Sequence, residues 1–241
     1  RSWPREPLNN SMDEPVVALV VAAGSGSRLG APVPKALVEL GGMSLVRRSV
    51  LAMRAGGVGH VVITTPEGCL SVFEAALSGL DDVVCTVGGI ERQDSVRLGL
   101  DVLSERFGPE TVVLVHDAAR PLVPPHVVTT VLQAVINGAE VAIPVIAVHD
   151  SIRQVGDEGS QMIDRSTLRA IQTPQGARLG LLREAHDHVA RRGLVITDDA
   201  SAIEVLGHHV VLVPGHHDAL KITEQLDLAL AQGILDGRSR A

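Results

Sequence analysis

The chain alternates short, almost continuously apolar runs with segments of helical periodicity, and this alternation limits its possible folds more than any other feature. Six runs rich in β-branched residues are predicted to be strands: "VVALVVAA", "HVVITTP", "DVVCTVGG", "TVVLVHD", "AEVAIPVI" and "HHVVLVPG". Most of them are too continuously apolar to have a face in water. Strands that alternate with helices predict right-handed crossovers and an α/β fold, with a mainly parallel sheet covered by helices on both faces.

Seven helices are predicted between the strands. In residues 94–107, for example, Val96, Leu100, Leu103 and Phe107 recur at helical spacing, which gives that helix an apolar face for the core. The predicted helices are residues 44–54, 70–80, 94–107, 125–137, 178–192, 198–206 and 224–235.

The length and composition favour one domain. A chain of 241 residues with 45% hydrophobic content can bury one substantial core. We expect a disordered leader (1–14), whose first eleven residues hold two prolines and no periodicity, then one domain (15–236) and a short tail (237–241). The apolar runs are far shorter than the roughly 20 residues of a membrane span, and no secretory signal is recognised. Two cysteines without metal-binding spacing read as reduced thiols, so we expect a cytoplasmic protein with no membrane partner.

The charge and aromatic content argue against nucleic acid as a partner. The net charge is −7, and the chain has no Tyr, two Phe and one Trp, whereas nucleic-acid binding needs a basic surface and usually aromatic platforms. An acidic protein can still bind a small anion where cations gather locally. Ligands of parallel α/β sheets bind at the carboxyl ends of the strands, where this chain has "GSGSRLG", "GGIERQDS", "HDAARP" and "GHHDALKIT".

The stretch "AAGSGSRLGAPVPKA", residues 22–36, follows the first predicted strand and has the form of a phosphate-binding turn. It lacks the G-K-[ST] ending of a P-loop, and its glycines are spaced G-x-G-x-x-x-G, unlike the dinucleotide fingerprint. Arg28 and Lys35 could surround a triphosphate. The alternative is two solvated charges beside a tight turn.

A second polar stretch, "VHDAARP", brings Asp117 and Arg120 to the same edge of the sheet. An Asp at a strand end beside a phosphate site is a natural Mg²⁺ ligand, although Asp117 could instead cap the following turn. Residues 149–176 interrupt the alternation with a turn, "GDEGS", between two β-capable segments. This predicted hairpin could pack on a second subunit or fold onto its own domain.

Taken in order, "AAGSGSRLG" with "PK", "GGIERQDSV", "VHDAARP", "DRSTL", "QTPQG", "TDDASAIE" and "KIT" closely resemble the 2-C-methyl-D-erythritol 4-phosphate cytidylyltransferase family. The resemblance extends from about Val16 to Leu235. It implies a Rossmann-like nucleotidyltransferase fold with a protruding hairpin arm, and transfer of the cytidylyl group of CTP to methylerythritol phosphate with Mg²⁺. It also implies a homodimer that exchanges the arm, residues 149–176. Ribitol 5-phosphate cytidylyltransferase is the alternative with the same loop and reaction.

The resemblance also assigns roles to individual residues. The implied catalytic cations are Arg28, Lys35, Arg165 and Lys221. The implied nucleotide-binding residues are Ala22, Ala23, Gly24, Gly26, Gly89 and Ser95. The implied substrate-binding residues are Asp117, which is also the implied metal ligand, Arg120, Ser151, Thr173 and Thr197. With an exchanged arm, Ser151 and Arg165 would serve the neighbouring subunit's site.

The sequence departs from the family pattern at two positions. Ser151 stands where the family often has threonine, which keeps the hydroxyl group and loses a methyl group. Ile90 stands at a commonly polar position of "GGIERQDS", which weakens any side-chain contact to the nucleotide and leaves backbone contacts possible.

Overall fold

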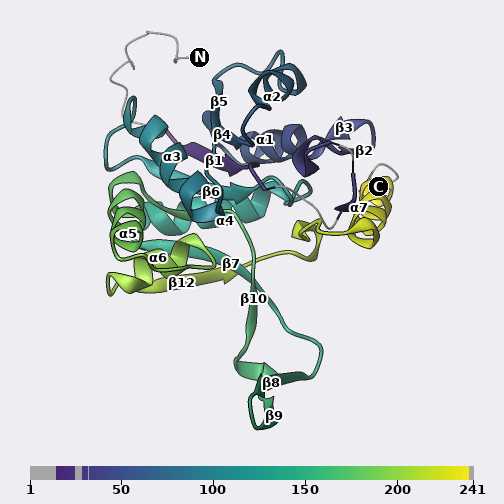
Figure 1. Cartoon of the computed structure of the whole chain (residues 1–241), viewed down its shortest axis with the longest axis vertical. Coiled ribbons are helices and arrows are strands. Elements are labelled where there is room, and N and C mark those ends of the chain that lie inside the picture. Colours follow the sequence, from purple (N-terminus) through teal and green to yellow (C-terminus); the bar gives the residue numbers. More distant parts are fainter. Residues whose placement is uncertain (1–14, 25–28, 32, 239–241) are drawn as a thin grey trace.

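The computed structural model describes residues 15–24, 29–31 and 33–238. An eight-stranded sheet runs through the middle of this described part, with helices on both faces (Figure 1). All six predicted strands belong to it. Its strands are β1 (Val17–Val21), β4 (His60–Thr65), β5 (Val83–Val87), β6 (Val112–Asp117), β7 (Val141–Ala147), β10 (Arg169–Ile171), β11 (Gln175–Arg178) and β12 (Val210–Pro214).

The sheet is mainly parallel, as predicted. β1 lies at the centre and pairs in parallel with β4 on one side and β6 on the other, while β5 extends the sheet beyond β4. β12 pairs in parallel with β7. The exceptions are β11, which lies between β6 and β7 and runs antiparallel to both, and β10, which runs antiparallel to β7.

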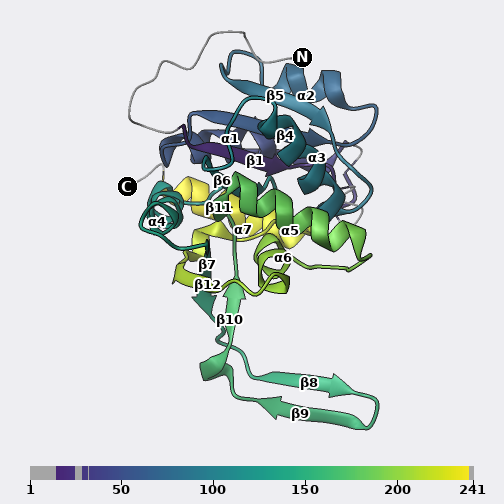
Figure 2. The same cartoon turned by 90° about the vertical axis from the view of Figure 1, so that its left-hand side faces the viewer.

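The segment predicted as a hairpin arm has two parts. Strands β8 (Ile152–Gly156) and β9 (Gly159–Ile163) pair only with each other among the described strands and project from the body (Figure 2). The chain then passes through a single 3-10 turn (Arg165–Thr167) and returns to the central sheet as β10, antiparallel to β7. The projecting part is therefore shorter than residues 149–176.

Seven helices form at the predicted places, with different ends. They are α1 (Leu45–Ala55), α2 (Leu70–Ala76), α3 (Arg92–Ser104), α4 (Pro125–Ile136), α5 (Leu179–Arg191), α6 (Asp199–Val205) and α7 (Gln225–Arg238). Helix α2 ends earlier than predicted, shortly before Gly79, whose φ of 78° lies in the left-handed region that ends helices. Helix α3 begins at Arg92, two residues before the predicted start, which places this arginine in its first turn.

The core forms on both faces of the sheet because successive strand residues point to opposite sides. Ala18 and Val20 of β1 pack into one cluster with α1, α2 and α4. Val17 and Leu19 pack into a second cluster with α3, α5 and α6. A third, smaller cluster joins α7 to Leu29, Leu40 and Leu122. Of the helices in the described residues, none is both long and apolar enough to cross a membrane.

Candidate active site

A cleft of about 290 Å³ opens where β1 and β6 end, between the segment after β1, the start of α3 and the segment that precedes α7. The structure brings residues that are far apart in the sequence to this cleft, as the parallel sheet predicts. Predicted site residues in its lining are Ala22, Ala23, Gly24, Lys35, Ser95, Asp117 and Lys221. Arg28 and Gly26 lie outside the described residues, and their roles stay predictions.

Two glycines directly after β5 pack closely against neighbouring residues, which include Ala23 and Ser95 of the cleft lining. A Cβ atom on Gly88 would lie 2.7 Å from Ala23 Cβ, and one on Gly89 would lie 2.3 Å from Asp94 Cβ, so neither position accepts a side chain without a shift. The Gly89 amide donates to Ser95 Oγ at 3.1 Å. The two predicted nucleotide-binding positions, Gly89 and Ser95, are thus held together. Ile90, at the mouth of the cleft, has a 99% exposed side chain.

Lys35 lies in a short 3-10 helix (Lys35–Leu37) at the edge of the cleft. Its Nζ donates to the Ile222 carbonyl at 3.2 Å. The neighbouring Lys221 turns to the end of β6, where its Nζ lies 2.8 Å from Asp117 Oδ2. The two predicted catalytic cations, Lys35 and Lys221, are therefore connected, because Lys35 binds the carbonyl of the residue that follows Lys221.

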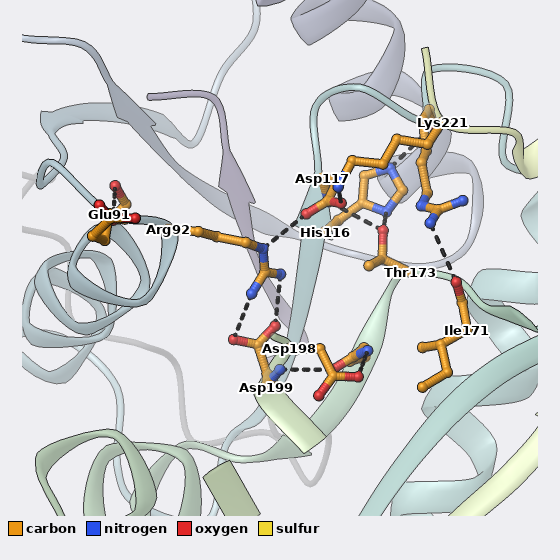
Figure 3. A network of polar contacts seen from close by, with 12 residues as sticks. Glu91, Arg92, His116, Asp117, Ile171, Thr173, Asp198, Asp199 and Lys221 are labelled. Atoms are coloured by element: carbon orange, nitrogen blue, oxygen red, sulfur yellow. Dashed lines mark hydrogen bonds and ion pairs between the residues drawn. The ribbon is translucent and has the colours of Figure 1, made fainter. Parts of the chain in front are cut away.

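Asp117 is the carboxylate at the end of β6, and each of its oxygens faces a cation. Arg92 Nε lies 3.1 Å from Oδ1, opposite Lys221 at Oδ2 (Figure 3). Burial alone would raise the pKa of Asp117, but the positive charges of Arg92 and Lys221 outweigh burial and hold this pKa well below its usual range. Asp117 is therefore ionised at neutral pH, and its low pKa makes it a weak base.

A basin adjoins the cleft on the other side of Asp117, toward β10 and β11. It shares Arg92, Asp117 and Lys221 with the cleft. Its other predicted site residues are Arg120, Thr173 and Thr197. The Arg120 guanidinium donates to the carbonyls of Ala219, at 2.7 Å, and Ile171, at 3.3 Å. Apart from Ser151, all the predicted substrate residues therefore lie together around the basin.

The arm residues lie elsewhere. Ser151 and Arg165 are both exposed, and neither lines the cleft or the basin of its own chain. Arg165 donates to the His149 carbonyl at the foot of the projecting hairpin. Their predicted role is in the site of a second subunit, and the single chain leaves that role a prediction.

Sequence reasoning did not select Arg92 or Asp199. Arg92 lines both hollows, and it also contacts the fully buried carboxylate of Asp199 at the start of α6, 2.8 Å from Nη2 to Oδ2. Both residues stand in quoted stretches, "GGIERQDS" and "TDDASAIE". The sequence did contain a signal for Arg92, because a cation in the first turn of a helix that follows a strand lies at the edge of the sheet where ligands bind.

The side chains around the cleft and the basin show how the predicted Mg²⁺ could be bound. Among the described residues, no group of three His, Cys, Asp or Glu side chains could hold a metal ion. Asp117 offers a hard carboxylate at the junction of cleft and basin, which suits Mg²⁺ only where phosphate oxygens or water supply the other ligands, as is usual for Mg²⁺ in nucleotide sites.

A mainly parallel sheet with a cleft at its strand ends, Lys35 at the edge of the cleft and a carboxylate on a neighbouring strand is typical of α/β proteins that bind phosphorylated ligands. Comparison with solved structures places this protein among the nucleotidyltransferases. The chain is similar to the crystal structure of 2-C-methyl-D-erythritol 4-phosphate cytidylyltransferase from Thermus thermophilus, with a TM-score of 0.74 and 33% identity over 90% of this chain and 98% of that one.

The family is shown by sequence. Residues 16–237 match the family model of 2-C-methyl-D-erythritol 4-phosphate cytidylyltransferase (IspD), and the chain belongs to this family. The cytidylyltransferase of Saccharopolyspora erythraea is 49% identical, with 91% of this chain and 99% of the relative covered. That of Streptomyces coelicolor is 43% identical, with 92% and 85% covered. The chain is thus a nucleotidyltransferase, and these matches favour methylerythritol phosphate over the ribitol phosphate alternative.

Proposed function

We propose that the cleft binds CTP and the basin binds 2-C-methyl-D-erythritol 4-phosphate, so that the chain makes 4-diphosphocytidyl-2-C-methyl-D-erythritol and pyrophosphate for isoprenoid precursor synthesis. The observation that carries this proposal is the position of Asp117, Arg92 and Lys221 on the wall shared by the two hollows. Two phosphorylated substrates bound in the two hollows would bring their phosphates together at this wall.

The reaction is a substitution at phosphorus. An oxygen of the acceptor phosphate forms a bond to the α-phosphorus of CTP, the bond from that phosphorus to the bridging oxygen breaks, and pyrophosphate leaves with the electron pair. Because the attacking oxygen is already ionised at neutral pH, no general base is needed, which agrees with the low pKa of Asp117. The protein's contribution is positioning and stabilisation of charge.

On the nucleotide side, Lys35 and Arg28 would neutralise the triphosphate. The backbone of Ala22, Ala23, Gly24 and Gly26 would follow the nucleotide, and the Gly89–Ser95 turn would meet the cytosine base. Support comes from Gly88, where an added Cβ atom would lie 2.7 Å from Ala23 Cβ, so that no larger side chain at this position could crowd the predicted nucleotide-binding residues. Mg²⁺, held by Asp117 and the triphosphate, would supply further charge neutralisation.

On the acceptor side, Lys221 and Arg120 would bind the acceptor phosphate, and the hydroxyl groups of Thr173 and Thr197 would bind its polyol. Ser151 and Arg165 would complete the site from the arm of a second subunit. This part of the proposal is supported by the exposure of apolar side chains on the arm, with Val155 81% and Met162 61% exposed, which a partner would cover. The family's role in precursor synthesis agrees with a cytoplasmic location.

The experiment supplies the protein with CTP and Mg²⁺ and, in separate reactions, with methylerythritol phosphate or ribitol 5-phosphate, and follows pyrophosphate release. We expect turnover with methylerythritol phosphate, with the cytidylylated product identified by mass. Turnover with ribitol phosphate alone would contradict the acceptor assignment, and absence of Mg²⁺ dependence would contradict the metal assignment.

A further inference from the structure

The Arg92 side chain divides its donors between two carboxylates. Its Nε faces Asp117 Oδ1 at 3.1 Å, whereas Nη1 and Nη2 donate to the two oxygens of Asp199 at 3.2 and 2.8 Å (Figure 3). Because the guanidinium group is planar and rigid, the paired contact with Asp199 fixes the direction in which Nε points. The position of the Asp117 carboxylate is therefore tied to Asp199.

Asp199 is well suited to be the fixed end of this arrangement. Its side chain is fully buried, and Oδ1 also lies 3.1 Å from Nε2 of the buried His186 on α5. Its backbone amide donates to the side-chain carbonyl of Gln175 on β11 at 2.9 Å. Asp199 is thus held by contacts from two other elements, and a carboxylate held in this way can hold an arginine in turn.

The charges are consistent with the geometry. Burial alone would lower the pKa of Arg92, but the charges of Asp199 and Asp117 outweigh it and raise the pKa. Burial alone would raise the pKa of Asp199, but Arg92 and His186 lower it to about 2. The contact between Arg92 and Asp199 is therefore an ion pair with a charge on both sides.

We propose that Arg92, oriented by Asp199, is a positioning residue that fixes the Asp117 carboxylate between the two substrates. This inference rests on the proposed function of Asp117. Arg92 begins α3, directly after the turn assigned to the base, and Asp199 follows the acceptor residue Thr197. The Asp117–Arg92–Asp199 chain of contacts thus joins the nucleotide half of the site to the acceptor half, and sets their relative position at the reacting phosphorus.

The test compares Asp199→Asn with wild type in the CTP and methylerythritol phosphate assay. The amide keeps the shape of the side chain but provides only one acceptor oxygen without charge, so the guanidinium group is no longer held in one direction. We expect kcat to fall by about 10- to 100-fold, because small displacements of reacting groups have effects of this size. The KM for CTP should change by less than about threefold, since Asp199 does not line the cleft.

Asp117→Asn tests whether the effect of Asp199→Asn acts through the position of Asp117 or through a general loss of structure. If Asp199 acts through Asp117, the double variant should be no slower than Asp117→Asn alone, because the carboxylate to be positioned is already gone. An equal fall of kcat in both backgrounds would overturn the inference, and so would wild-type kcat in Asp199→Asn. Normal activity of Asp117→Asn would instead contradict the proposed function.

Two further variants keep the test decisive. Arg92→Lys keeps the charge but cannot contact both carboxylates in the same way, so it should show the kcat loss of Asp199→Asn and serves in its place if that variant does not fold. The matched control is Arg183→Ala, which removes an exposed Arg–Asp contact of 3.4 Å between α5 and Asp101 of α3. The Arg183→Ala control should keep wild-type kcat. The melting temperatures of Arg92→Lys and Arg183→Ala should be measured as well. A wild-type kcat for Arg92→Lys would also overturn the inference.

Discussion

His116 stands next to Asp117 in β6 and fixes the backbone on which that carboxylate is carried. The Thr173 hydroxyl accepts from the Asp117 amide at 3.1 Å, so its single hydrogen is available to donate to His116 Nδ1 at 2.9 Å. His116 Nε2 lies 3.2 Å from the Arg120 carbonyl, which can only accept. A neutral imidazole with its hydrogen on Nε2 satisfies both contacts.

The neutral state of His116 makes the fold sensitive to acid. Burial lowers the pKa of His116 from 6.5 to about 4. Between these two values the unfolded chain binds a proton that the folded chain does not, so the free energy of unfolding should fall as pH decreases from 6.5 to about 4, by about 3 kcal/mol in total. Urea unfolding across this pH range measures the slope.

His116→Gln keeps a donor for the Arg120 carbonyl and cannot be protonated. This variant should lose the part of the pH slope that belongs to His116, even if its free energy of unfolding is lower at every pH. The same slope in the variant and in wild type would show that other groups cause the acid sensitivity.

The segment from Lys221 to Gln225 connects the end of β6 to Lys35 and to the glycine-rich stretch. Lys221 contacts Asp117, the Ile222 carbonyl accepts from Lys35, and Gln225 Nε2, at the start of α7, donates to the Leu29 carbonyl at 2.7 Å. Leu29 is buried and lies within the glycine-rich stretch, directly before Gly30. Helix α7 therefore holds the glycine-rich stretch at Leu29, although the helix lies at the other end of the chain.

Gln225→Ala should weaken CTP binding without stopping the reaction. Loss of one hydrogen bond is worth about 1 kcal/mol, which corresponds to a rise of about fivefold in the KM for CTP. The KM for methylerythritol phosphate and the melting temperature should change little. Gln232→Ala, on the same helix but bonded to Gly41 and Asp236, is the matched control. An equal effect of both variants would contradict a specific role for Gln225.

The elements differ in how well the sequence predicts them, for physical reasons. Continuous apolar runs identified the buried parallel strands, because such strands have no wet face. β11 was missed since "QGAR" carries no such pattern: Gly176 lies against Val131 and Leu114, and a Cβ atom there would be 2.8 Å from the valine. The Arg92–Asp199 contact joins residues 107 positions apart, which no local pattern encodes. The motifs predicted that Asp117 and Lys221 lie at the same edge of the sheet, but they did not predict the contact between the two side chains.

At the scale of the whole molecule, the projecting hairpin leads to the last prediction. If the arm serves the neighbouring subunit, a dimer of one Arg165→Ala chain and one Lys221→Ala chain has one site in which both side chains are intact. Each homodimer should be nearly inactive. The mixed dimer, isolated with two different tags, should recover about half of wild-type activity, because one of its two sites is complete.

The reciprocal pairing distinguishes the two possible arrangements of the arm. A chain that carries both substitutions, paired with a wild-type chain, should be nearly inactive if arms are exchanged, since each site then lacks either Arg165 or Lys221. If each arm served its own chain, this dimer would keep about half of the activity and the first mixed dimer would have none. Sedimentation of each mixture shows that dimers form, so a difference in activity between the two pairings reports the path of the arm alone.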